Sequence, residues 1–287
     1  MANIKGILIP IGGNEDKGFE EDEIHRLDYI EEGILFHVVQ QAGGPDAKIV
    51  VIPTASSIPV EVGENYLKAF DKLGCKDVTI LDIRTRKQAV SAVALNHVKQ
   101  AQCVMFSGGD QSKISNYIGG TALHDMLLER YKNDEGFVIA GTSAGAMAMA
   151  EEMIAGGSST KSFVKDAVKM KKGLGFIPQL IIDTHFIQRG RFGRVAEAVA
   201  KHPDLLGVGL AEDTGIIIKN GKDCTVIGSG MALVFDPRKL KHNNEKILKP
   251  GTPMSLTNMK VHVLANGDRF NIKSSKIKVL PVESPFV

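Results

Sequence analysis

The alternation of short apolar runs with longer amphipathic stretches constrains the fold more than any other feature of this sequence. We expect β-strands at residues 4–11, 48–54, 77–83, 102–107 and 136–141. Four of these runs are nearly continuous in apolar residues, which is typical of strands buried on both faces of a parallel sheet. Patterns of helical spacing lie between them, at residues 20–42, 60–73, 87–100 and 121–133. The alternation therefore predicts βαβ units with helices on both faces of the sheet.

The last third of the chain has a different pattern, with short apolar segments separated by Gly, Asn and Asp. We expect strands at residues 205–211, 214–219, 223–228, 231–236 and 259–265. Asn220-Gly221 and Asn266-Gly267 are typical of hairpin turns, so the sheet is expected to continue with antiparallel strands. Because no Pro/Ser-rich linker or internal repeat divides the chain, we expect a single α/β domain spanning residues 1–287.

Composition excludes several classes of protein. Hydrophobic residues make up 43% of the chain and charged residues 24%, which argues against a disordered or fibrous protein. The formal net charge of +2 is too small for a general nucleic-acid binder. No apolar run reaches the roughly 18 residues that a membrane-spanning helix needs. We therefore expect neither nucleic acid nor membrane as a partner.

The amino-terminal run and the cysteines indicate a cytoplasmic protein. The run MANIKGILIPIGGNED lacks a small-residue cleavage site and passes directly into acidic sequence, so we interpret it as a first strand and not a signal peptide. Cys75, Cys103 and Cys224 are widely spaced and form no C-x-x-C pair. They are expected to be small buried side chains in a reducing compartment.

The segment GTSAGA at residues 141–146 supplies a candidate nucleophile. It follows an expected strand and precedes the apparently helical AMAMAEEM, which places G-x-S-x-G in a strand–turn–helix context. Its glycines permit a strained turn that lifts the Ser143 hydroxyl out of the sheet, at the edge where open α/β sheets bind ligands. The alternative is a Gly/Ser turn that only caps the helix.

His185 is the candidate base, because it ends an apolar strand at residues 176–182 and so lies at the same edge. Asp183 and His185 would also suit a metal pair, but no further Cys or His cluster completes a ligand set, so no metal is expected. Either Glu212 or Asp213, again at a strand end, could orient the imidazole. These residues occur along the chain in the order Ser, His, acid, whereas in α/β-hydrolases the acid precedes the histidine. The same chemistry is therefore expected on a different fold.

The segment Ser107–Gln111 ends the neighbouring strand and contains two glycines. Glycine lets the backbone approach a substrate carbonyl closely, so the N–H groups of Gly109 and Ala144 are the predicted oxyanion hole. The alternative is a tight turn that needs glycine in any case.

Three arginines follow the candidate base closely. Arg189, Arg191 and Arg194 suggest an anionic substrate, because the guanidinium fork binds carboxylates in a bidentate manner. Arg191 and Arg194 can share a helix face, whereas Arg189 points nearly opposite in a regular helix, so not all three need face the site. The alternative is a solvated basic helix start.

Taken together, the motifs resemble those of cyanophycinases, in the order of that family and over nearly the whole chain. They are IGGNEDK (11–17), PTAS (53–56), FSGGDQ (106–111), GTSAGA (141–146), DTHFIQRGRFGR (183–194), GLAEDTG (209–215) and VHVLANGDRF (261–270). The resemblance implies a three-layer αβα sandwich like that of class I glutamine amidotransferases, with a mostly parallel central sheet. It also implies a serine peptidase of cyanophycin, a polyaspartate that carries arginine on each side-chain carboxylate. Members of the family act from the chain end and release β-aspartyl-arginine dipeptides.

Carried over to this sequence, the resemblance implies that Ser143 is the nucleophile, His185 the base and Glu212 the orienting acid. It implies no cofactor, and it suggests a homodimer. The family's substrate pocket corresponds to Gln111, Asp183, Thr184, Arg189, Arg191 and Arg194. Thr184 stands where the family usually has glutamine.

Two other functions remain open at this point. One is a related serine peptidase that acts on short aspartyl or isoaspartyl peptides, which the shorter side chain of Thr184 leaves room for. The other is a non-catalytic binding module of the same fold, against which the intact set of Ser143, His185 and Glu212 argues.

Overall fold

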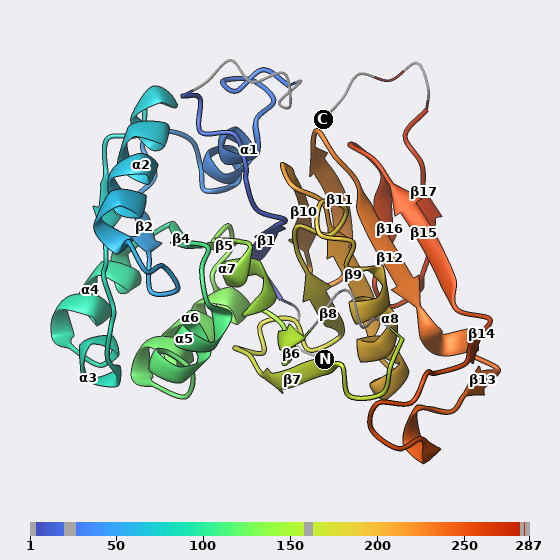
Figure 1. The fold of residues 1–287 in the computed structure, drawn as a ribbon. Helices are drawn as coiled ribbons and strands as arrows, with labels where there is room; N and C mark the ends of the chain where they lie inside the picture. The colour runs from blue at the N-terminus through green and yellow to red at the C-terminus, as the bar shows by residue number, and fades with distance from the viewer. Residues whose placement is uncertain (1–3, 20–26, 158–162, 282–283, 285–287) are drawn as a thin grey trace.

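The computed structural model describes residues 4–19, 27–157, 163–281 and 284 of the chain. Its largest element is a nine-stranded sheet (Figure 1). In spatial order its strands are β17 (Ile277–Lys278), β16 (Arg269–Asn271), β11 (Asp223–Gly228), β10 (Thr214–Lys219), β1 (Ile7–Ile11), β5 (Val138–Thr142), β4 (Cys103–Phe106), β2 (Ile49–Ile52) and β3 (Val78–Ile80). Neighbours from β1 to β3 are parallel, and those from β1 to β17 are antiparallel. This confirms the expected parallel sheet with antiparallel strands added from the last third.

A second sheet was not expected. It contains β15 (Lys260–Leu264), β12 (Ala232–Asp236), β9 (Leu206–Leu210) and β8 (Leu180–Asp183), in that order. The segments 205–211, 231–236 and 259–265 are strands as predicted, but they do not extend the central sheet. The Asn220-Gly221 turn does close a hairpin, with φ of 55° and 62°. The prediction for Asn266-Gly267 was wrong, because this turn carries the chain from β15 in one sheet to β16 in the other.

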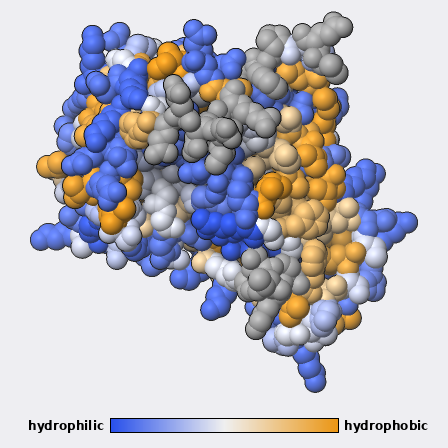
Figure 2. All heavy atoms as spheres, turned by 45° about the horizontal axis from the view of Figure 1, so that its top comes forward, coloured by the Kyte–Doolittle hydropathy of each residue, from blue (hydrophilic) through white to orange (hydrophobic). Residues whose placement is uncertain are grey.

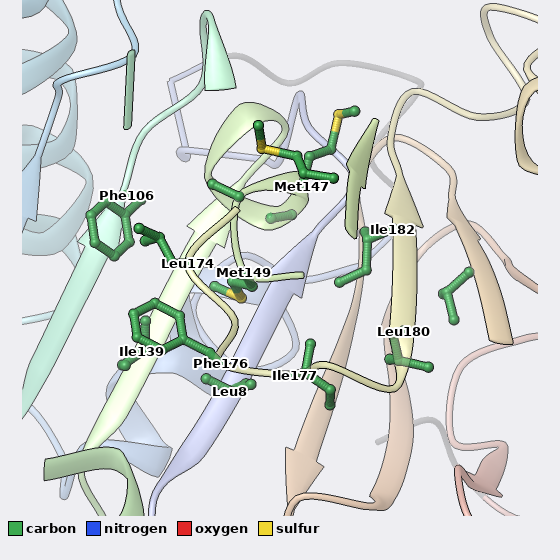
Figure 3. Packing of buried hydrophobic residues seen from close by; sticks show 14 of the residues in the cluster. Leu8, Phe106, Ile139, Met147, Met149, Leu174, Phe176, Ile177, Leu180 and Ile182 are labelled. Carbon is green, nitrogen blue, oxygen red and sulfur yellow. The ribbon is translucent and has the colours of Figure 1, made fainter. Parts of the chain in front are cut away.

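The two faces of the central sheet are covered differently (Figure 1). Helices α1 (Ile34–Gln41) and α2 (Pro59–Lys72) pack on one face. Helices α4 (Ala92–Gln100) and α6 (Ala122–Asn133) and the second sheet pack on the other. Figure 3 shows the core on this second face, where Leu8 and Ile139 of the central sheet lie near Phe176, and Ile177 lies between them and Leu180 of β8. Helix α8 (Phe192–Lys201) in turn packs against β8 and β9.

Several helices are shorter than their sequence pattern predicts. Within the described part of the pattern at 20–42, only Ile34–Gln41 is helical, and residues 27–33 form turns and bends. Residues 20–26, which include Ile24, lie outside the described residues. The pattern at 87–100 divides into α3 (Arg86–Ala89) and α4, because the Ser91 hydroxyl accepts a hydrogen bond from the Ala94 N–H and starts a new helix.

The expected helix AMAMAEEM is the largest error. Helix α7 is short and comprises Ala144–Met147. The chain then enters β6 (Glu152–Gly157), which pairs with β7 (Val168–Lys172). Residues 146–150 are all buried, so this run has no polar face and its apolar composition reflects burial and not helical periodicity. The remaining elements are α5 (Gln111–Tyr117), β13 (His242–Asn243), β14 (Leu256–Thr257) and the 3-10 helices η1 (Pro237–Lys239) and η2 (Glu245–Ile247).

The surface and the cysteines complete the description. In Figure 2, hydrophobic side chains gather on the right, the side on which Figure 1 shows the C-terminal strands. Cys75, Cys103 and Cys224 are all buried and free, as expected. Within the described part of the chain, no helix is long and apolar enough to cross a membrane. The single domain spanning 1–287 stays a prediction.

Candidate active site

Four of the predicted site residues, Gly109, Ser143, His185 and Arg189, meet in a cleft at the carboxyl ends of β1, β4 and β5. The cleft has a volume of about 440 Å³. It is lined by Asn14, Glu15, Lys17, Val62, Asn65, Tyr66, Gly108, Gly109, Thr142, Ser143, His185 and Arg189. A larger hollow of about 680 Å³ lies over β10, β11 and β16, but it contains none of the expected catalytic side chains. We therefore identify the site by its chemistry and not by its size.

The backbone at Ser143 adopts the strained turn that the motif predicts. Ser143 has φ of 50° and ψ of −108°, and it lies between β5 and α7. Its N–H donates to the carbonyl oxygen of Ile11 at 2.9 Å. A Cβ at Gly145 would lie 2.5 Å from the Phe106 carbonyl oxygen, so the turn closes only with glycine there. The hydroxyl of Ser143 is thereby presented to the cleft.

His185 connects the serine to a carboxylate. Its Nε2 lies 2.9 Å from Ser143 Oγ, and its Nδ1 lies 2.6 Å from Glu212 Oε1. Glu212 accepts from Nδ1–H, which leaves Nε2 as the proton acceptor facing the serine. The imidazole packs against the β1 loop, since a Cβ at Gly13 would lie 2.4 Å from the ring. The structure thus brings Ser143, His185 and Glu212 together.

The sequence left open whether Glu212 or Asp213 orients the histidine. The carboxylate of Asp213 accepts hydrogen bonds from Ser229 Oγ at 2.5 Å and from the Asp16 N–H at 3.2 Å. Of these two acids, Glu212 is the one hydrogen-bonded to the imidazole, and its second oxygen accepts a long hydrogen bond from Asn14 Nδ2 at 3.4 Å. The geometry therefore favours Glu212.

The protonation state of His185 suits a base. Burial lowers its pKa below the ordinary 6.5, the hydrogen bond to Glu212 opposes this, and the charges of Arg189 and Arg191 lower the pKa further. The net result is a lowered pKa, so the imidazole is neutral at neutral pH and can accept a proton from the serine.

The predicted oxyanion donors are available. Gly109 has φ of 136°, and a Cβ there would lie 2.1 Å from the Ala55 carbonyl oxygen. Among the hydrogen bonds of the described residues, neither the Gly109 N–H nor the Ala144 N–H has an acceptor. The turn does require glycine for its own geometry, as the alternative interpretation held, and it also leaves these two donors unused.

The three arginines separate into two environments. Arg189 lines the cleft. Arg191 and Arg194 instead turn inward to Asp183: Arg191 Nη1 and Arg194 Nη2 lie 3.1 Å and 3.3 Å from Asp183 Oδ1. Arg194 Nε also lies 3.1 Å from Asp183 Oδ2, close enough for an ion pair but not aligned as a hydrogen bond. We call Asp183, Arg191 and Arg194 the Asp183 cluster.

The Asp183 cluster does not face the cleft. Asp183 is fully buried and Arg194 is 5% exposed. Thr184 is also fully buried, with its hydroxyl against Met147 Sδ at 3.4 Å and its carbonyl oxygen accepting from Arg191. The resemblance implied substrate-facing positions for these residues, whereas in this structure the charges of the Asp183 cluster pair with one another. Gln111 Nε2 donates to the Ile154 carbonyl oxygen at 2.8 Å, and the substrate-binding role of all these residues stays a prediction.

Sequence reasoning missed a buried carboxylate next to the nucleophile. Glu15 is 4% exposed and accepts hydrogen bonds from the hydroxyls of Tyr66 at 2.7 Å and Thr142 at 2.5 Å, with Lys17 Nζ at 3.1 Å. The available signal was the run of three charged residues, Glu15 to Lys17, directly after the first strand, within a segment used above only as a family motif.

No metal-binding arrangement accompanies these residues. Within the ranges that the structure describes, no group of three or more His, Cys, Asp or Glu side chains could hold a metal ion. The expectation that neither metal nor cofactor takes part stays a prediction.

Comparisons with known proteins agree with this geometry. The model of peptidase family S51 matches residues 24–226. A cyanophycinase of Trichormus variabilis is 36% identical over 268 residues, which covers 93% of this chain and 86% of that protein. A cyanophycinase of Geminocystis herdmanii is 35% identical over 271 residues, which covers 94% of this chain and 95% of that protein.

Two solved structures share the fold. A peptidase from an acI-B1 Actinobacterium superposes with a TM-score of 0.60 at 19% identity, over 91% of this chain and 99% of that chain. A putative peptidase E protein of Listeria monocytogenes gives a TM-score of 0.52 at 16% identity, over 78% of this chain and 98% of that chain. At these identities the two structures support the architecture and nothing beyond it.

Proposed function

This chain belongs to peptidase family S51, and we propose that it is a serine exopeptidase that hydrolyses the aspartate backbone of cyanophycin and releases β-aspartyl-arginine dipeptides. The observation that carries the proposal is the hydrogen-bonded series of Ser143, His185 and Glu212, which opens on a cleft that also contains Arg189. The names of the similar cyanobacterial proteins supply the substrate.

In the proposed mechanism, Ser143 Oγ attacks the carbonyl carbon of a backbone amide while His185 Nε2 takes the hydroxyl proton. The carbonyl oxygen becomes an oxyanion, which the N–H groups of Gly109 and Ala144 stabilise. As the C–N bond breaks, His185 gives its proton to the leaving amine, and the acyl group stays on Ser143. A water molecule then attacks the acyl-enzyme while His185 takes one of its protons. As the bond between the acyl carbon and Ser143 Oγ breaks, His185 returns that proton to Oγ and Ser143 is regenerated.

Substrate selection in this proposal depends on Arg189. A β-aspartyl-arginine unit has carboxylates as well as a guanidinium, so the cleft needs a cation for the acidic part. Of the three arginines only Arg189 lines the cleft, and the Asp183 cluster supports the backbone of the segment around His185 from within the core.

The competing function is hydrolysis of short aspartyl or isoaspartyl peptides. The buried position of Thr184 weakens the reason for considering it, because this side chain does not reach the cleft whatever its length. A non-catalytic binding module is disfavoured by the imidazole, which is neutral, hydrogen-bonded on both nitrogens and directed at a serine hydroxyl.

The direct test is to incubate the purified protein with purified cyanophycin and to determine the masses of the products over time. We expect β-aspartyl-arginine from the earliest time point and a slow decrease in polymer length. Early appearance of mid-length fragments would argue for internal cleavage. Faster hydrolysis of isoaspartyl dipeptides than of the polymer would favour the competing function.

We also propose a homodimer. Phe192, Met231 and Val263 are 43%, 38% and 62% exposed, on α8 and on or beside the second sheet. Apolar side chains exposed in this number on one part of a surface favour association. Sedimentation velocity of the wild type and of Val263→Asp tests this, because a charge within the interface should shift the dimer to monomer.

A further inference from the structure

Glu15 is the most buried charged group of the cleft, and its carboxylate has the most hydrogen-bonding and ionic partners there. Its side chain is 1% exposed, yet it accepts from the Tyr66 and Thr142 hydroxyls and pairs with Lys17. Burial alone would raise the pKa of Glu15, but Lys17 and the two hydroxyl donors outweigh it and hold the pKa below 4.5. Glu15 is therefore a stable carboxylate beside the nucleophile, and such a charge needs a function or a partner to offset its desolvation.

Lys17 is the partner, and it is held at the cleft wall. Its ammonium group lies 3.1 Å from Glu15 Oε1 and 3.2 Å from the Glu15 carbonyl oxygen, and 5.4 Å from the centroid of the Tyr66 ring. Its side chain is 25% exposed and lines the cleft together with Ser143 and Arg189. An ammonium has three donors. One is used in the hydrogen bond to the Glu15 carbonyl oxygen and one faces Glu15 Oε1 in the ion pair, so within the described residues one donor is left for a ligand.

The pairing fixes both the position and the direction of this cation. A free lysine on a surface samples many rotamers, whereas Lys17 is confined by two contacts to one residue. The negative end of the pair is buried among hydroxyl donors, and the positive end faces the cleft. The loop that carries both residues also contacts the triad, since Asn14 bonds to Glu212 and the absence of a side chain at Gly13 makes room for His185.

We propose that Lys17, held by Glu15, is a substrate-binding residue whose ammonium group binds a carboxylate of the unit being cleaved. Lys17 and Arg189 together then form a binding site with two cations. This inference rests on the proposed peptidase function and names the anionic group that the same cleft recognises. A β-aspartyl-arginine unit with a free end has two carboxylates, which matches two cations lining one cleft. Glu15 is a positioning residue in this arrangement and does not touch the substrate.

The test separates carboxylate binding from the chemistry of Ser143. Phenylmethanesulfonyl fluoride, a neutral reagent, labels an activated serine, and a bound ligand slows that labelling. The labelling rate is measured with increasing β-aspartyl-arginine and, separately, with its dicarboxamide, which lacks both negative charges. The proteins are the wild type, Lys17→Met, Lys17→Arg and, as a matched control on helix α2 outside the cleft, Lys68→Met. Cyanophycin hydrolysis by the wild type is followed in parallel.

We expect Lys17→Met to need about tenfold more β-aspartyl-arginine for half-protection, which is typical for the loss of one charge-assisted hydrogen bond. Protection by the dicarboxamide and the labelling rate without ligand should stay at the wild-type values. Lys17→Arg should recover most of the difference, and Lys68→Met should behave as the wild type. If Lys17→Met leaves Glu15 unpaired and unfolds, the double variant Glu15→Gln/Lys17→Met removes that charge and gives the same comparison.

Three results would overturn the inference: equal weakening of acid and dicarboxamide, a parallel fall in labelling without ligand, or no protection of the wild type by the acid. A wild type that fails to degrade cyanophycin, while Lys17→Met still weakens protection by the acid alone, would instead refute the proposed function and leave the role of Lys17 standing.

Discussion

Two buried carboxylates, Glu15 and Asp183, both precede His185 in the sequence and have opposite relations to the cleft. Glu15 is surrounded by hydroxyl donors and one lysine, and its pKa is lowered. Asp183 is surrounded by two arginines, yet burial raises its pKa above 3.8 against their opposing effect. The cation that pairs with Glu15 lines the cleft, whereas those that pair with Asp183 are turned away from it. Nearness to His185 in the sequence therefore does not make a charge part of the site.

The largest effect is expected from replacing Ser143, the proposed nucleophile of the cleft that Glu15 lines. Ser143→Ala should remove nearly all turnover, because no other hydroxyl lies within hydrogen-bonding distance of His185 Nε2 among the described residues. The fold should be unchanged, since the side chain contributes no capping hydrogen bond. Steady-state hydrolysis and thermal unfolding measure both. Retention of more than a few per cent of kcat with a normal melting curve would remove Ser143 from the mechanism.

The second effect concerns the acid. Glu212→Gln should lower kcat by about ten-thousand-fold, because an amide can favour the wrong imidazole tautomer. Asp213→Asn is the control, since its carboxylate bonds to Ser229 and the Asp16 backbone and not to His185. Kinetics of the two variants at one pH are compared with circular dichroism of each. A larger loss for Asp213→Asn than for Glu212→Gln would reverse the assignment.

The third prediction concerns the Asp183 cluster, and its effect should appear in the free energy of unfolding. Asp183→Asn leaves Arg191 and Arg194 in the interior without their anion, which should cost about 3–5 kcal/mol of unfolding free energy. Urea denaturation measures this loss. The control is Asp82→Asn, which breaks the exposed ion pair with Arg84 and should cost about 1 kcal/mol or less. Full stability combined with a selective rise in KM would place Asp183 in the substrate pocket after all.

The fourth effect compares arginines across the two regions. Arg189→Ala should lower kcat/KM on cyanophycin about tenfold with little change in stability, because it removes one charge-assisted contact from the cleft. Arg194→Ala should instead lower the unfolding free energy, because it leaves Asp183 with one cation fewer. Parallel kinetics and denaturation separate these cases. A silent Arg189→Ala would leave the acidic part of the substrate to Lys17 alone.

The sequence predicts the parallel half of the fold well, for a physical reason. Strands β1, β2, β4 and β5 are buried on both faces, so burial appears directly as continuous apolar runs. The sequence also predicts the strands of the last third, but the alternation of apolar and polar residues within a strand does not indicate which sheet that strand joins. The prediction of a helix over AMAMAEEM was wrong because α7 and the residues after it are buried, so the run lacks the polar face by which a helix is recognised.

The site divides in the same way. Strand ends and a turn motif point to Ser143 and His185, since both features follow from local backbone requirements, but they leave open which of Glu212 and Asp213 orients the imidazole. The Asp183 cluster and Glu15 could not be assigned, because a charged residue has the same letter whether it is exposed, paired in the core or directed at a ligand. Arg189 and Arg191 are two residues apart, and only packing decides that the first lines the cleft and the second turns to Asp183.

The smallest predicted effect is a shift in pH dependence, and it connects Arg189 to His185. The imidazole must be neutral to act as the base, so kcat/KM should rise with pH through the pKa of His185 and then level off. Burial, Arg189 and Arg191 hold that pKa below 6.5, against the raising effect of Glu212. Arg189→Ala removes one of the positive charges that disfavour the imidazolium, so the acidic limb should move to higher pH, by less than about one unit. Profiles of Arg189→Ala and Lys68→Met, measured on a neutral ester to avoid substrate charge, give the comparison. A limb that stays in place in Arg189→Ala would mean that Arg189 does not contribute to the lowered pKa of His185 and affects only substrate binding.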